Sequence, residues 1–125
     1  CVSEYSCFDF QDSYLDINLS NNYEGKFEVT SNNGDSFNLR VSTINLRDAT
    51  VDCSSSYACF NLTKSELFTE NVNLNITSGI NGVYASVGSF VEFNSNTSLT
   101  CPENTSGSSY KEGCIKTSNN SIPSS

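Results

Sequence analysis

Apolar and polar residues alternate along most of the chain, which is the pattern of β-strands that bury one face. The alternation is clearest in residues Leu15–Leu19, Phe37–Val41 and Val72–Ile76. Asn and Gly residues, which tolerate the backbone angles of tight turns, separate these runs. No window of a dozen residues has the period of an amphipathic helix, and only Thr63–Glu70 could form one or two helical turns. The pattern predicts an all-β chain.

Two segments of the sequence recur at long spacing. Cys1–Phe8 returns as Cys53–Phe60, displaced by 52 residues, and Val29–Asn32 returns as Ile76–Gly79. Residues 1–101 therefore consist of two units of about 48–52 residues each. The segment 102–125 differs from both units and ends in a tail rich in Ser, Thr and Asn.

A repeat of this length favours a solenoid, in which each coil covers the apolar face of its neighbour. With about two coils of 22–26 residues per unit, we expect a short parallel β-helix of about four coils over residues 1–101. A β-sandwich is the alternative, because it is the commoner all-β fold at this length, although it needs no sequence period. Residues 102–125 are expected to form a disulfide-closed cap or loop followed by the tail.

The six cysteines are expected to form disulfides, since their number is even and the chain is short. A zinc site is disfavoured because the sequence has no His and no pair of cysteines spaced by two residues. Equivalent residues two coils apart lie about 9.6 Å apart, whereas a disulfide needs Cα atoms within about 7 Å. If Cys7 and Cys59 are equivalent positions two coils apart, this distance excludes a Cys7–Cys59 bond and leaves local pairing. The predicted bonds are Cys1–Cys7, Cys53–Cys59 and Cys101–Cys114.

The disulfides indicate an extracellular or cell-surface location. The sequence starts at Cys1 without a leader, so we expect that a leader has been removed or that the chain is cut from a longer one. Six N-x-S/T sequons are present, against about four or five expected by chance from the composition. Together with the cysteines they favour a secreted glycoprotein, the alternative being a polar surface that is never glycosylated. The candidate acceptors are Asn18, Asn61, Asn75, Asn96, Asn104 and Asn119.

The segments around the cysteine pairs carry a family resemblance. Each pair spans five residues, with a Tyr two positions before the second Cys and a Phe directly after it. This arrangement resembles the cysteine-bearing β-helix repeats of extracellular and surface-fibre glycoproteins of protists and algae. The resemblance covers residues 1–101 and implies a fibrous or adhesive surface glycoprotein. It transfers no functional residue.

The composition argues against several function classes. The absence of His excludes nucleophile–His catalysis, and a net charge of −8 disfavours nucleic-acid and anionic-membrane partners. No apolar run approaches the length of a membrane span. The acidic residues are better read as a solvated surface than as a glycosidase pair, and Asn32–Asp35 better as a turn than as a calcium loop. We therefore expect no enzyme, no metal and no cofactor beyond N-linked glycans; the acidic residues considered are Asp9, Asp12, Asp16, Asp48 and Asp52.

The first functional hypothesis is a structural subunit of an extracellular glycosylated fibre or coat. Because Cys1 opens directly into a repeat without a capping sequence, such subunits are expected to self-associate end to end. The alternative is a carbohydrate- or receptor-binding adhesin module that uses exposed tyrosines. Tyr5 and Tyr57 occupy matching repeat positions beside a predicted disulfide, which favours packing over the bridge rather than stacking on a sugar.

Overall fold

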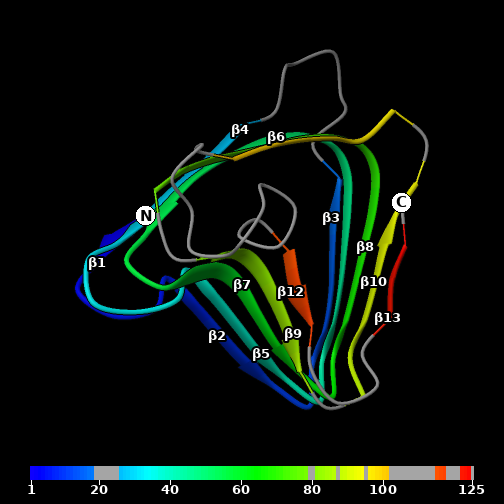
Figure 1. Cartoon of the computed structure of the whole chain (residues 1–125), viewed down its shortest axis with the longest axis horizontal. Helices are drawn as coiled ribbons and strands as arrows, with labels where there is room; N and C mark the ends of the chain where they lie inside the picture. The colour runs from blue at the N-terminus through cyan, green and yellow to red at the C-terminus, as the bar shows by residue number, and fades with distance from the viewer. Residues whose placement is uncertain are drawn as a thin grey trace.

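The computed structural model is a parallel β-solenoid of about four turns whose strands lie on three faces (Figure 1). It describes residues 1–18, 26–78, 81–86, 88–94, 96–101, 115–117 and 122–124. One face is a five-stranded parallel sheet. Its strands are β2 (Phe8–Gln11), β5 (Phe37–Arg40), β7 (Ala58–Thr63), β9 (Asn81–Ser86) and β12 (Ile115–Thr117).

The other two faces belong to one bent sheet, in which every pairing is also parallel. The long strands β6 (Thr43–Ser55) and β8 (Glu66–Ser78) turn the corner between these faces. The second face is completed by β3 (Tyr14–Asn18), β10 (Phe90–Phe93) and β13 (Ile122–Ser124). The third face is completed by β1 (Val2–Ser3), β4 (Lys26–Ser31) and β11 (Ser98–Thr100).

The strand register confirms the predicted solenoid. Phe37 pairs with Phe60 and Phe60 with Val83, so the inner coils are 23 residues long, while Phe8 pairs with Phe37 across a longer coil. Phe8 and Phe60 are thus equivalent positions two coils apart, as the 52-residue repeat requires. The β-sandwich alternative is wrong because neighbouring strands run parallel. The short helix considered at Thr63–Glu70 is also wrong, since these residues lie in β7, a corner and β8.

The core fills the tube between the three faces with stacked columns of like residues. Phe8, Phe37 and Phe60 stack with ring centroids 4.8 and 4.4 Å apart, close to the spacing between parallel strands. Val83 continues this column one coil further. Because side chains alternate across a strand, the apolar positions within the strands fall in such columns, whereas Val41, at the end of its run, lies at a corner and is exposed.

The corner between the first and second faces has the same construction in four successive coils of the described chain. A residue with positive φ is followed by a serine, at Asp12–Ser13, Val41–Ser42, Lys64–Ser65 and Gly88–Ser89. The Ser65 hydroxyl accepts a hydrogen bond from the Ser42 backbone N–H at 3.0 Å and donates one to the Thr63 carbonyl at 2.8 Å. Ser42 and Ser89 accept equivalent bonds from the coil before them. This serine ladder satisfies backbone groups that would otherwise be buried without partners.

The corner between the third and first faces is closed by disulfides. Cys1 bonds to Cys7 and Cys53 to Cys59, with Cα–Cα distances of 6.0 and 6.1 Å, as predicted. Cys101 is also disulfide-bonded, and Cys114, its predicted partner, lies outside the described residues. Within segment 102–125, β12 and β13 add a strand to each sheet by pairing with β9 and β10. The part of the chain that the structure describes contains no helix long and apolar enough to cross a bilayer.

Candidate functional site

In the described part of the chain, the N-terminal coil presents an open edge. Strands β1, β2 and β3 each pair with one neighbour only among the described residues, namely β4, β5 and β6. We call these three strands the N-terminal edge. Their remaining backbone N–H and C=O groups face away from the described coils, which is the arrangement that templates a further strand.

Apolar side chains of the N-terminal edge are only half covered. Phe8, Phe10, Leu15 and Ile17 point into the tube and pack against the core, yet they stay partly exposed. Their partners in the next coil are fully buried, with exposures of 0–1 %; these are Phe37, Leu39, Ile44 and Leu46. The difference arises because no described coil covers the outer side of the edge.

The acidic residues singled out in the sequence are spread along the outer faces. Asp9 forms an ion pair with Arg40 at 3.1 Å, and Asp16 forms one with Arg47 at 2.9 Å. The hydrogen bonds that Arg47 donates to the Asp16 carboxylate raise the pKa of Arg47 above its usual value. Asp48 accepts a hydrogen bond from the Asn71 amide at 2.7 Å. Each of these three carboxylates therefore pairs with a cation or an amide of the next coil.

Asp52 is the centre of a polar cluster on the third face. It accepts hydrogen bonds from Lys26 at 2.8 Å and from the Asn75 amide at 2.9 Å. The bond from Lys26, followed by that from Asn75, lowers the pKa of Asp52. The bond to Asp52, with a second to Glu28, raises the pKa of Lys26. Asp52 therefore keeps its negative charge to a lower pH than an isolated carboxyl does.

The sequon asparagines differ in their surroundings. Asn18, at the end of β3, and Asn96, in a turn with φ of 59°, are exposed. Asn61 and Asn75 lie within strands and are half-buried, and their amides donate to Asp35 and Asp52 of the preceding coil. The alternation of the strands turns Asn18, Asn61 and Asn75 outward, away from the tube. Asn104 and Asn119 lie outside the described residues.

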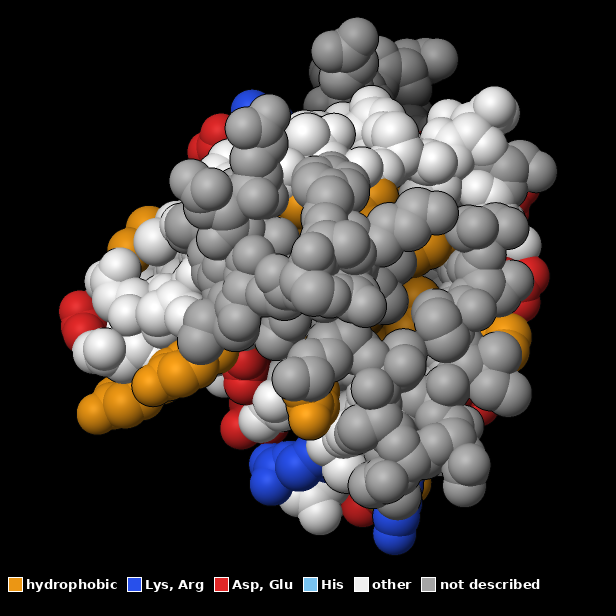
Figure 2. All heavy atoms as spheres, viewed as in Figure 1, with side chains coloured by type: hydrophobic (Ala, Val, Ile, Leu, Met, Phe, Trp, Pro, Cys, Tyr) orange, Lys and Arg blue, Asp and Glu red, His pale blue; other side chains and the backbone are white. Residues whose placement is uncertain are grey.

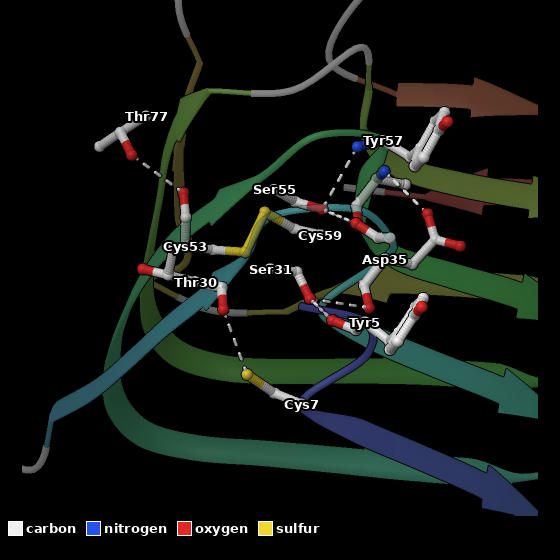
Figure 3. The surroundings of a disulfide bond; sticks show 12 residues. Tyr5, Cys7, Thr30, Ser31, Asp35, Cys53, Ser55, Tyr57, Cys59 and Thr77 are labelled. Carbon is white, nitrogen blue, oxygen red and sulfur yellow. Dashed lines mark hydrogen bonds between the residues drawn. A yellow bond between two sulfur atoms is a disulfide. The ribbon is translucent and has the colours of Figure 1, made fainter. Parts of the chain in front are cut away.

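The tyrosines do not cover the disulfides. Tyr5 is 74 % and Tyr57 54 % exposed, and both side chains point away from the Cys53–Cys59 bond (Figure 3). The expected packing over the bridge is therefore wrong. The core at this corner is closed by the disulfides and by Ser31 and Ser55, whose hydroxyls bond to backbone carbonyls, so that no ring is needed there.

The turn at residues 32–35 is held by polar side chains. The amides of Asn32 and Asn33 donate to the two carboxylate oxygens of Glu4, at 3.3 and 3.1 Å. Asp35 accepts from the Ala58 backbone N–H and from Asn61, both at 2.8 Å. These bonds explain the polar composition of the turn. Among the described residues, no group of three or more acidic or cysteine side chains is placed to hold a metal ion.

No family model, no curated protein and no solved structure matches this chain.

Proposed function

We propose that this chain is a structural subunit of an extracellular, glycosylated surface fibre or coat, in which copies join end to end. The N-terminal edge of one copy accepts the last coil of a second copy, which continues the stack in the same direction. Such a head-to-tail contact uses different surfaces on the two partners and does not close, so it generates filaments.

The observation that carries this proposal is the partial exposure of Phe8, Phe10, Leu15 and Ile17 next to unpaired strand edges. An added coil would bury these side chains, in the same way that the equivalent side chains of the second coil are buried. It would also pair the open backbone groups of the edge. The disulfides support an oxidising, extracellular-type environment. Glycans on the outward sequon asparagines would keep the lateral faces apart while leaving the ends free.

The test is the assembly state of the secreted protein over a wide concentration range. Sedimentation velocity and negative-stain electron microscopy are expected to show oligomers that lengthen with concentration. Phe10→Asp places a charge on the half-covered edge and should leave a monomer with intact disulfides. Tyr14→Asp is the matched control, because Tyr14 lies on the same edge but points outward. A wild-type protein that remains a monomer at millimolar concentration contradicts the proposal.

A further inference from the structure

Two asparagines of the chain directly precede a glycine, and the structure places them in different backbone settings. Asn33–Gly34 lies in the exposed turn between β4 and β5, whereas Asn81–Gly82 opens strand β9. The backbone nitrogen that follows an asparagine can attack the carbonyl carbon of its side chain, and a glycine has no side chain that hinders this approach. The attack closes a five-membered ring, so the backbone between the two groups has to rotate away from the extended form.

The backbone of Asn81 is held in the extended form that opposes ring closure. Asn81 pairs with Ala58 of β7, and the pairing continues from Val83 to Ser86. Gly82, between these paired positions, is buried. A residue inside a paired strand reacts only when the strand opens locally, and this opening costs free energy. The fold therefore protects Asn81.

Asn33 lacks this restraint. It is exposed, and residues 32–35 lie outside the strands. The Gly34 N–H donates no hydrogen bond to another described residue, so no such bond holds the attacking nitrogen in place. The Asn33 amide donates one solvent-exposed hydrogen bond, of 3.1 Å, to Oε2 of Glu4. A bond of this kind contributes about 0.5–1.5 kcal/mol, which leaves the side chain free to rotate out of it.

We propose that Asn33 is a site of spontaneous deamidation in the folded protein. The Gly34 nitrogen forms a bond to Cγ of Asn33, and the side-chain nitrogen leaves as ammonia with the proton of the Gly34 amide, which gives a succinimide. Water then opens the ring at one of its two carbonyl carbons and yields aspartate or isoaspartate. The reaction consumes only water and releases only ammonia, so it needs neither an enzyme nor a cofactor. It does not require that copies assemble.

The product places a negative charge against Glu4. In the unmodified turn, the amides of Asn32 and Asn33 donate to the two carboxylate oxygens of Glu4, at 3.3 and 3.1 Å. A carboxylate at position 33 cannot donate such a bond, and like charges that face each other on neighbouring strands are destabilising. Figure 2 shows acidic side chains at the corner beside β1 and no basic side chain next to them. The new charge therefore meets repulsion rather than a counter-ion.

The same turn holds the first coil on the second. Strand β1 has two residues, which pair with β4. Beside it, the Asn32 N–H donates to the Ser3 carbonyl at 2.9 Å and the Asn33 N–H to the Glu4 carbonyl at 2.8 Å. Isoaspartate routes the backbone through the side-chain carbon, which adds one backbone atom before Gly34 and displaces these bonds. Deamidation should therefore loosen β1, which is part of the N-terminal edge.

The experiment is incubation of the disulfide-bonded protein at mildly alkaline pH, followed by peptide mapping over time. Mass spectrometry detects conversion as a gain of about 1 Da, and isoaspartyl methyltransferase labels the isoaspartate fraction. In the folded protein, Asn33 should convert at least about tenfold faster than Asn81, because Asn81 reacts only on local opening. In the reduced protein in denaturant, both should convert at similar rates, since both precede a glycine. This comparison shows that the difference comes from the fold.

A variant of Gly34 tests the route of the reaction. Gly34→Ala should slow the conversion of Asn33 by at least about tenfold, because its side chain hinders the attacking nitrogen. The protein is expected to fold, since φ at Gly34 is not positive and the added Cβ would lie 3.4 Å from the Tyr5 carbonyl carbon, an ordinary contact.

A second variant tests the consequence for the first coil. Asn33→Asp is the aspartate product itself and should speed hydrogen exchange of the Thr30 and Asn32 amides by about two- to fivefold. These amides donate to the carbonyls of the first coil. Adding Glu4→Gln removes the repulsion and should restore slow exchange. The matched control is Asn96→Asp, in another exposed turn, which should leave exchange in the first coil unchanged.

Circular dichroism and non-reducing mass analysis establish that each variant is folded. Conversion of Asn33 ahead of Asn81 in the folded protein only, together with its loss in Gly34→Ala, supports the proposal. The proposal is overturned if Asn33 stays intact in the folded protein while the unfolded chain converts, if Asn81 converts as fast as Asn33 in the folded protein, or if folded Gly34→Ala converts as the wild type does. Unchanged exchange in Asn33→Asp would overturn the expected loosening of the first coil.

Discussion

Val41 occupies a backbone conformation that suits few residue types. Its φ is 50°, and its three equivalents in other coils are Asp12, Lys64 and Gly88. The left-handed region costs an ordinary residue about 1–2 kcal/mol, more for a β-branched one, and Asp tolerates it better. Because Val41 is 54 % exposed and is not part of the buried core, its replacement disturbs little packing. Val41→Asp should therefore raise the free energy of unfolding by about 1 kcal/mol in urea titrations. Val2→Asp, at an exposed strand position, should not raise the free energy of unfolding. Equal effects of the Val2 and Val41 substitutions would contradict the interpretation that the backbone of Val41 is strained.

The half-buried sequon residues Asn61 and Asn75 stabilise the solenoid through their amides. Each donates to a carboxylate of the previous coil, Asp35 or Asp52. Asn75→Asp or Asn61→Asp replaces this bond with two adjacent negative charges, which should lower the free energy of unfolding by about 1 kcal/mol at neutral pH. The control is Asn96→Asp, in an exposed turn, which should not destabilise. Losses that are the same at all three positions would show that the hydrogen bonds to Asp35 and Asp52 contribute nothing.

Asp52 makes the free energy of unfolding depend on pH. Its pKa is lowered in the folded state, mainly by Lys26, from an ordinary value of 3.8. A lowered pKa means that the folded state binds a proton less readily than the unfolded chain does. The contribution is therefore complete above pH 3.8 and is lost as the pH falls below it. Thermal unfolding of wild type and Asp52→Asn between pH 2 and 6 should converge in acid and differ at pH 6 by at most about 1 kcal/mol, since the pair is exposed. A constant difference across this range would contradict the assignment.

At the scale of elements, the serine ladder is the feature that holds the strands at a sharp corner. Ser65 is buried and links three coils by accepting from Ser42 and by donating its N–H to Ser89. Ser65→Ala leaves the Ser42 N–H without its partner in the interior, which should cost about 1–3 kcal/mol in unfolding free energy. Ser13→Ala, at the outer end of the ladder, should cost less because its hydroxyl is exposed. An equal cost at both positions would argue against the ladder.

The sequence predicts the strands better than the corners. Two features of the sequence were enough to predict parallel coils and local disulfides: the alternation at Phe37–Val41 and Val72–Ile76, and the repeat of Cys1–Phe8. Both predictions depend only on which residues must face the tube. A period of two residues in the apolar pattern does not show where a strand bends. The bends within β6 and β8 could therefore not be predicted. The helical reading of Thr63–Glu70 failed because Lys64 adopts positive φ at a corner.

The candidate sites were predicted only in part, for similar reasons. The partial exposure of Phe8 and Phe10 follows from their position in the first coil, and the sequence repeat identifies that coil. The serine ladder was missed because the chain has 23 serines and its rungs are unevenly spaced. The exposure of Tyr5 and Tyr57 could not be predicted, since it depends on which side of a corner each ring takes. The recurrence of a serine after each positive-φ residue is the signal that could have revealed the corner.

At the scale of the whole molecule, the disulfides follow a period of two coils. Val29 pairs with Cys53, and Cys53 pairs with Ile76. Val2 pairs with Thr30 and Asn75 with Thr100, which extends the register by one residue to Cys1 and Cys101. One column therefore contains Cys1, Val29, Cys53, Ile76 and Cys101. A cysteine thus alternates with an apolar residue at the corner. In the first two cysteine-bearing coils, the second cysteine, Cys7 or Cys59, directly precedes Phe8 or Phe60 on the first face.

Cys114 precedes Ile115, which pairs with Val83 in the same column as Phe8 and Phe60. Peptide mapping without reduction should therefore recover a Cys101–Cys114 bond, the third staple of the series. Removal of this bond in Cys101→Ser/Cys114→Ser should lower the free energy of unfolding by about 3 kcal/mol, since the bond closes a longer loop than the other two. Cys1→Ser/Cys7→Ser is the comparison and should cost about 2 kcal/mol. A free thiol at Cys114, or a bond from Cys101 to any other cysteine, would break the two-coil period on which this prediction rests.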